Sequence, residues 1–178
     1  MDRRRFLAST VALGGGAVAG CLDGAIDGIG GRDGSETAGS TALRDLELES
    51  LAVDASPGGS VRVVPPDRPV VLDFFATWCA PCKPLLDELE LVAEEVGGDV
   101  AFRSITSETD RDAVTSFWRQ HGGPWPVLLD SDVEATRAIG VDGLPTTVVV
   151  DRTGAVAWRH AGLAAAGKIR EGLDAATG

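Results

Sequence analysis

The sequence predicts an α/β fold in which helices flank a mixed central β-sheet. Two observations support this prediction. Short apolar runs alternate with segments of helical periodicity through the middle of the chain, and the chain closes with two strand-like runs followed by a helix. The alternation predicts parallel strands joined by helices, whereas the closing pair of strands predicts an antiparallel hairpin. The 178 residues, of which 44% are hydrophobic, suffice for one domain with an apolar core.

The first half of the predicted domain contains three strands and one long helix. A leading strand covers about residues 46–51, and a second covers 60–64. The run VVLDFF at 70–75 lies between prolines and is almost entirely apolar, which predicts a buried strand. Leucines and valines recur at helical spacing through 80–96, and two glycines directly after this segment end the amphipathic helix.

The second half of the domain continues the alternation. Ser131 and Glu134 match a capping box, in which the two side chains pair with free backbone N–H groups at a helix start, and this helix is expected to reach about residue 139. A turn at 152–154 joins the last two strands. The other predicted elements are strands at 100–105, 126–130, 146–151 and 155–160 and helices at 110–121 and 168–176.

The chain is acidic, with 27 Asp and Glu residues against 16 Lys and Arg and a net charge of −11. Nucleic-acid binding requires a basic face, so this balance argues against a nucleic-acid partner. An acid-rich, lysine-poor surface resembles the surfaces of salt-adapted proteins of halophilic archaea, where high salt screens self-repulsion. We therefore expect a haloarchaeal protein, with an ordinary soluble acidic protein as the alternative.

Residues 1–20 have the features of an export signal. Arg3, Arg4 and Arg5 precede an apolar stretch at 6–19, which is shorter than the about 20 residues that span a bilayer. The sequence RRRFL also resembles a twin-arginine signal, which serves the export of folded proteins. A buried N-terminal helix is the alternative, and three successive glycines argue against it.

Cys21 follows this segment in the sequence Val-Ala-Gly-Cys, which resembles a lipobox. In that motif the cysteine is lipidated and becomes the new N-terminus; the alternative is an ordinary cleavage site beside an incidental cysteine. Residues 21–42 are rich in Gly, Asp, Ser and Thr, which predicts a flexible tether. We therefore expect a signal at 1–20, a lipid-anchored tether at 21–42 and a folded domain at 43–178, held at the extracytoplasmic face of the cell membrane.

Cys79 and Cys82 lie close together within the stretch FFATWCAPCKP. A structural zinc site needs four ligands, but the chain offers only Cys21 and two histidines beyond this pair, without suitable spacing. A structural disulfide that closes so short a loop removes little entropy from the unfolded chain and stabilises weakly. Both alternatives are less favoured than redox chemistry, and we predict no metal site.

Redox exchange requires a thiolate nucleophile and a second thiol near enough to resolve the mixed disulfide. Cys79 is expected at or just before the N-terminus of helix 80–96, where free N–H groups and the helix dipole favour the thiolate. Cys82 is expected one turn further in and suits the resolving role. Pro81 is tolerated in the first turn of the helix, because a backbone N–H at that position would have no acceptor within the helix.

The stretch FFATWCAPCK resembles the active site of the thioredoxin superfamily, whose Trp-Cys-x-Pro-Cys-Lys motif is matched by residues 78–83. The resemblance runs from about Val61 to the C-terminus. Residues 83–144 separate Cys82 from Pro145, a longer interval than in a minimal thioredoxin. The chain therefore looks most like the TlpA/ResA-like extracytoplasmic thiol–disulfide oxidoreductases. This resemblance implies a thioredoxin fold with an inserted helix and strand.

The resemblance also implies roles for four further residues. Asp73 matches a buried acid of thioredoxins and would exchange protons with Cys82, with a solvated strand-end carboxylate as the alternative. Pro145 matches the cis-proline of the family and would pack against the cysteine pair, while the backbone of Leu144 would pair with an extended substrate segment. Trp78 would flank the site and shape the docking surface; the alternative is a core tryptophan.

These features together predict a membrane-anchored thiol–disulfide oxidoreductase that exchanges disulfides with exported protein substrates. No bound cofactor is expected, but a membrane or soluble redox partner has to recycle the cysteine pair. The protein is expected to act as a monomer. The alternative function is that of a non-catalytic thioredoxin-fold adaptor, or of a copper chaperone that uses the two thiols as soft metal ligands.

Overall fold

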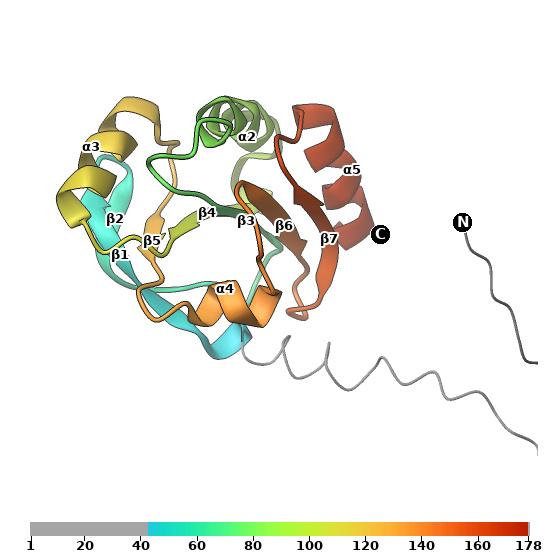
Figure 1. The fold of residues 1–178 in the computed structure, drawn as a ribbon. Helices are drawn as coiled ribbons and strands as arrows, with labels where there is room; N and C mark the ends of the chain where they lie inside the picture. The colour runs from blue at the N-terminus through green and yellow to red at the C-terminus, as the bar shows by residue number, and fades with distance from the viewer. Residues whose placement is uncertain (1–42, 178) are drawn as a thin grey trace, which may run out of the picture. The chain divides into compact units, whose positions relative to one another are not determined.

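The structure, a computed structural model, describes residues 43–177, which form a seven-stranded mixed sheet with helices on both faces (Figure 1). The strands follow the order β2-β1-β5-β4-β3-β6-β7. The three central strands β5, β4 and β3 are parallel to one another, and every pair outside this centre is antiparallel. The mixed α/β architecture predicted from the sequence is confirmed.

The helices and strands match the predicted segments to within a few residues. The main exception is the second strand, which begins at Ser56 because it forms a tight hairpin with the first strand. Asp54 in this turn has a φ of 45°, a left-handed conformation that Asp tolerates. The strands are β1 (Glu47–Val53), β2 (Ser56–Arg62), β3 (Val70–Phe74), β4 (Ala101–Thr106), β5 (Val127–Leu129), β6 (Thr146–Val150) and β7 (Val156–Ala161). The helices are α2 (Cys82–Val96), α3 (Arg111–His121), α4 (Glu134–Ile139) and α5 (Ala166–Thr177), with a 3-10 turn η1 (Gly97–Asp99).

Strand β3 is central to the sheet and carries the chain towards the cysteine pair. It pairs in parallel with β4 and antiparallel with β6, and all five of its residues are buried. Successive side chains of a strand point to opposite faces of the sheet. Val70, Leu72 and Phe74 therefore face α4. Val71 and Asp73 point to the opposite face, which α2 covers.

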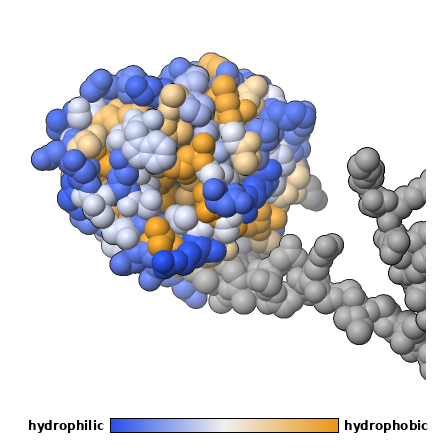
Figure 2. All heavy atoms as spheres, viewed as in Figure 1, coloured by the Kyte–Doolittle hydropathy of each residue, from blue (hydrophilic) through white to orange (hydrophobic). Residues whose placement is uncertain are grey.

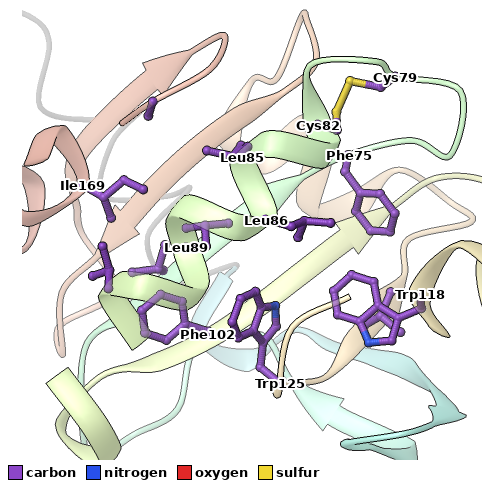
Figure 3. Packing of buried hydrophobic residues seen from close by; sticks show 14 of the residues in the cluster. Phe75, Cys79, Cys82, Leu85, Leu86, Leu89, Phe102, Trp118, Trp125 and Ile169 are labelled. Carbon is purple, nitrogen blue, oxygen red and sulfur yellow. A yellow bond between two sulfur atoms is a disulfide. The ribbon is translucent and has the colours of Figure 1, made fainter. Parts of the chain in front are cut away.

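The two faces of the sheet carry separate apolar clusters. Helices α2, α3 and α5 cover one face, and α4 covers the other (Figure 1). In the larger cluster, leucines from α2 lie close to aromatic side chains, as Figure 3 shows for Leu89, Phe102 and Trp125. The apolar stripe of α2 predicted from its leucine spacing is therefore the surface that holds this helix, and the cysteines at its start, on the sheet.

The segment with α3 and β5 corresponds to the predicted inserted helix and strand. Strand β5 pairs in parallel with β4 and antiparallel with β1. This position joins the N-terminal hairpin to the rest of the sheet. Asp110 caps α3, because its carboxylate accepts a hydrogen bond from the backbone N–H of Ala113 at 3.0 Å.

The capping box predicted at Ser131 is wrong. Helix α4 begins at Glu134 without a side-chain cap from Ser131, which is exposed. Instead the buried carboxylate of Asp130 accepts hydrogen bonds from the N–H groups of Ala135 at 3.2 Å and Thr136 at 2.9 Å. The physical reason is that β5 ends just before Asp130, so this side chain already lies inside the fold at the start of the helix.

The predicted signal at 1–20, the tether at 21–42 and the lipidation site Cys21 lie outside the described residues. Within residues 43–177, no helix is long and apolar enough to cross a membrane. The surface seen in Figure 2 has apolar side chains scattered among hydrophilic ones.

Candidate redox site

Cys79 and Cys82 form a disulfide at the N-terminal end of α2, with 5.4 Å between their Cα atoms (Figure 3). Cys82 is the first residue of the helix, and its backbone N–H donates a hydrogen bond to the carbonyl oxygen of Cys79 at 3.2 Å. The helix was predicted to begin at residue 80, with Cys82 one turn inside it. In the structure the two cysteines span a single turn that leads into the helix.

The electrostatic surroundings of this turn favour a thiolate on reduction. Pro81 occupies the N-cap position of α2, makes no side-chain cap, and the first turn contains no acidic residue. The positive end of the helix dipole is therefore not neutralised by a carboxylate of its own helix. Cys79 has 4% of its surface exposed and Cys82 1%, so Cys79 is the slightly more exposed residue of the pair.

Asp73 lies on β3, on the sheet face that α2 covers, with 2% of its surface exposed. Burial raises the pKa of Asp73 from 3.8 to about 7, and a hydrogen bond from Ser104 opposes this shift. The alternative of a solvated strand-end carboxylate is therefore wrong. A carboxyl group with a pKa near neutrality can both accept and release a proton at physiological pH.

The partners of Asp73 come from the neighbouring strand and were not foreseen from the sequence. The Ser104 hydroxyl donates to Asp73 Oδ2 at 3.1 Å, and the Trp125 indole N–H donates to Ser104 Oγ at 3.0 Å. The other carboxylate oxygen, Oδ1, is buried without a hydrogen-bond partner, as is the hydroxyl of Thr147. Thr147 pairs directly with Asp73 across β6, and Ser104 pairs with it across β4. Both residues could have been identified from the sheet register, but only if the order of the strands had been known.

The predicted substrate-contact residues gather at one end of the sheet. Trp78 has 75% of its surface exposed, so the alternative of a core tryptophan is wrong. Trp78 and Leu144 line a cavity of about 330 Å³, together with Phe74, Phe75 and other side chains. The Leu144–Pro145 peptide bond is cis, and Pro145 is buried. The structure thus brings Trp78 and Leu144, which precedes the cis-proline, to one cavity next to the turn formed by Cys79–Cys82, here called the redox turn.

The alternative of a metal site has no supporting ligand set in the part of the chain that the structure describes. No group of three or more His, Cys, Asp or Glu side chains in residues 43–177 is arranged to hold a metal ion. The two histidines, His121 and His160, instead contact aromatic rings, those of Phe117 and Trp158.

Comparison with known proteins agrees with this geometry. The Redoxin family model matches residues 41–174, which include the whole sheet and the cysteine pair. The chain belongs to the Redoxin family. A solved relative with the same fold is the pneumococcal exposed lipoprotein thioredoxin Etrx1 of Streptococcus pneumoniae strain TIGR4, with a TM-score of 0.61 and 22% sequence identity. The match covers 72% of this chain and 97% of Etrx1. The predicted thioredoxin fold is thereby confirmed.

Two curated relatives of this Redoxin chain are named for thiol–disulfide chemistry. The thiol-disulfide oxidoreductase ResA of Bacillus thuringiensis (strain Al Hakam) is 36% identical over 90 residues, covering 49% of this chain and 51% of ResA. The thiol:disulfide interchange protein DsbE of Escherichia coli (strain K12) is 31% identical over 123 residues, covering 66% of this chain and 62% of DsbE. The chain thus spans about half the length of the ResA that it matches and somewhat more of DsbE. The resemblance to the TlpA/ResA-like branch is confirmed.

Proposed function

We propose that this protein is a thiol–disulfide oxidoreductase that works through Cys79 and Cys82. The observation that carries the proposal is the disulfide at the start of α2, on the sheet face that also buries a carboxyl group with a pKa of about 7. A disulfide that only stabilised the fold would need no carboxyl group of such a pKa buried on the same sheet face, and it would stabilise weakly because its loop is short.

In the reducing direction, the Cys79 thiolate attacks one sulfur of a substrate disulfide and forms a mixed disulfide, while the other substrate sulfur leaves as a thiolate. Cys82 then loses its proton to Asp73 and attacks the sulfur of Cys79. This step releases the second substrate sulfur and closes the Cys79–Cys82 bond. Two electrons move from the cysteine pair to the substrate, and the oxidising direction reverses the same steps.

Recycling of the pair requires a second redox protein. In the reducing direction, the oxidised pair takes two electrons from a membrane or soluble dithiol partner. In the oxidising direction, the pair is left reduced by its substrate and gives those two electrons to an oxidant. The chain's own residues supply the nucleophile, the resolving thiol and the proton acceptor, so no bound cofactor is required.

Protein substrates are proposed to bind in an extended conformation beside the redox turn. The backbone of Leu144 pairs with the substrate strand, Pro145 packs against the cysteine pair, and Trp78 contacts the substrate from the opposite side. The exposed indole of Trp78 and the adjacent cavity support this arrangement, because exposed aromatic side chains are typical of docking surfaces.

The chain is further proposed to be exported, cleaved before Cys21 and held at the outer face of the membrane by lipids on that cysteine, acting there as a monomer. The signal-like residues 1–20 support this proposal. The solved relative Etrx1 is described as an exposed lipoprotein. The acidic composition supports a salt-adapted, haloarchaeal setting.

A reduction assay tests the enzymatic proposal. The purified full-length protein is given insulin as the disulfide substrate and dithiothreitol as the electron donor, and Cys79→Ser serves as the control. We expect insulin reduction well above the rate with dithiothreitol alone, and loss of this acceleration in the variant. A protein that fails to accelerate reduction but binds copper(I) tightly through the two thiols would instead be a metal chaperone.

A further inference from the structure

Glu108 lies in the loop between β4 and α3 and holds the turn that carries the redox pair. Its carboxylate accepts two hydrogen bonds from Thr77, one from the backbone N–H at 2.6 Å and one from the hydroxyl at 2.8 Å. Hydrogen bonds to an ionised acceptor are shorter and stronger than neutral ones. These two contacts therefore form a clamp between segments 31 residues apart in the sequence.

Thr77 is part of the turn that presents both Trp78 and Cys79. The backbone N–H of Cys79 donates to the carbonyl oxygen of Ala76 at 3.1 Å, which closes the turn around Thr77. The clamp therefore holds a residue two positions before the proposed nucleophile and directly before the exposed indole. Any rotation of this turn would move the Cys79 sulfur and the Trp78 ring together.

The Glu108 side of the clamp is itself anchored to the sheet. The backbone N–H of Glu108 donates to the Thr106 hydroxyl at 3.3 Å, and that hydroxyl lies 3.4 Å from Glu108 Oε2. Thr106 is buried at the end of β4. The carboxylate is consequently fixed with respect to the rigid sheet rather than swinging on a free loop.

The clamp also joins two walls of the cavity beside the redox turn. Ser107, next to Glu108, and Trp78, next to Thr77, both line the cavity of about 330 Å³. Loss of the clamp would let these walls separate. Because the β4–α3 loop opens the inserted segment, the insertion reaches the redox site through Glu108.

We propose that Glu108 is a positioning residue, which through Thr77 sets the orientation of Cys79 and the shape of the substrate cavity. The inference rests on the proposed thiol–disulfide exchange at the same site. A carboxylate suits this position because its two ionised oxygens accept both hydrogen bonds from Thr77. Glutamine can keep both contacts only as weaker, neutral hydrogen bonds, in which the Thr77 hydroxyl accepts from the NH₂ group, so Glu108→Gln weakens the clamp.

The test compares four full-length variants with the wild type in insulin reduction. Glu108→Gln removes the charge that strengthens the clamp and Thr77→Val removes one of its hydrogen bonds, whereas Thr77→Ser keeps both donors. Glu90→Gln is a matched control, because Glu90 is an exposed acid on α2. We expect kcat/KM to fall about tenfold in Glu108→Gln and Thr77→Val, the loss typical of one hydrogen bond to a charged group. Thr77→Ser and Glu90→Gln should stay near the wild-type value.

Combining Glu108→Gln with Thr77→Val should cost little more than either change alone, because both act on one contact. The proposal is overturned if the two single variants retain the wild-type kcat/KM, or if Thr77→Ser loses as much as Thr77→Val. Thermal unfolding of each variant identifies any general loss of structure, and the Thr77 pair still decides the question if Glu108→Gln does not fold.

A further measurement separates this inference from the proposed function. If the wild type itself does not accelerate insulin reduction, the proposed function fails. The rate at which iodoacetamide alkylates reduced Cys79 needs no turnover and still tests the clamp. An alkylation rate in Glu108→Gln and Thr77→Val that differs from the wild type and from Thr77→Ser supports positioning by Glu108, and equal rates in all four proteins overturn it.

Discussion

The two faces of the central sheet are built differently, and β3 displays the difference within one strand. On the face covered by α4, its side chains are all apolar, and Leu72 has no exposed surface. On the face covered by α2, Asp73 lies between Val71 and Phe75 and keeps one carboxylate oxygen without a partner. Burial of a carboxyl group costs stability unless its hydrogen bonds are satisfied.

The α4 face contributes apolar packing, whereas the α2 face buries a carboxyl group that costs stability and has a proposed role in proton exchange. The unfavourable carboxyl group lies on the face whose helix begins with the cysteine pair. The Ser104 hydroxyl reduces this cost by donating a hydrogen bond to Asp73, and the Trp125 indole in turn donates to Ser104. Substitutions on the two faces should therefore separate stability from redox activity.

The largest effect is expected at Cys79, in the turn that leads into α2. Cys79→Ala should lower the rate of insulin reduction by on the order of 10³-fold, because the nucleophile is removed. Its stability should change little, since the lost disulfide closes a very short loop. Urea unfolding alongside the reduction assay checks both, and a large loss of stability would mean that the disulfide is a structural element.

The opposite behaviour is expected on the α4 face. Leu72→Ala should destabilise the fold by ~2–5 kcal/mol, because it removes a fully buried side chain and leaves a cavity. The rate constant of the folded fraction should remain close to that of the wild type. The free energy of unfolding from urea titration, combined with kcat/KM at low temperature, measures the two quantities, and a selective loss of activity would contradict the division between the faces.

Asp73→Asn should raise stability while it slows catalysis. The carboxyl pKa is 3.8 when unfolded and about 7 when folded, so the contribution of Asp73 to stability is greatest below pH 4 and is lost as the pH rises to 7. The variant lacks this loss and should be more stable at pH 8 by up to ~4 kcal/mol. Disulfide exchange should slow by roughly 10²-fold as the proton acceptor is lost.

Urea titrations from pH 4 to 8 test the Asp73 prediction. The control is Asp87→Asn, which removes an exposed acid of α2 and should preserve the wild-type pH dependence. If Asp73→Asn shows the same pH dependence of stability as the wild type and Asp87→Asn, Asp73 is not buried as described.

The smallest effect is expected for Ser104→Ala. Loss of the hydroxyl donor removes the interaction that lowers the pKa of Asp73, so this pKa should rise further. The pH at which the stability loss ends should move upward, and the free energy of unfolding at pH 8 should fall by ~1 kcal/mol. Unfolding of this variant across the same pH series checks the direction, and a downward shift would contradict it.

Sequence periodicity was sufficient to predict the architecture, and the spacing of Cys79 and Cys82 at an expected helix start was sufficient to predict the redox pair. The apolar runs at β3 and β6 and the leucine spacing of α2 act locally, so their structures follow from neighbouring residues. Asp73 and Pro145 were found through the resemblance to thioredoxins, which fixes their distance from the motif. The exposed position of Trp78 also agrees with that resemblance.

The missed features all depend on contacts between distant segments. Ser104 meets Asp73 only through the register of two parallel strands, and Glu108 meets Thr77 only because the β4–α3 loop returns to the redox turn. The start of α4 was misassigned for a related reason, since Asp130 caps the helix from a position fixed by the end of β5. Local sequence patterns contain no information on such pairings.

Trapping the mixed disulfide tests the central claim most directly. Reduced full-length Cys82→Ala is mixed with insulin, and the covalent products are identified by mass spectrometry. We expect a stable adduct through Cys79, because the resolving thiol is absent, and no comparable adduct through Cys82 in Cys79→Ala. Absence of an adduct in Cys82→Ala, or equal adduct formation by both variants, would contradict the assignment of Cys79 as the nucleophile.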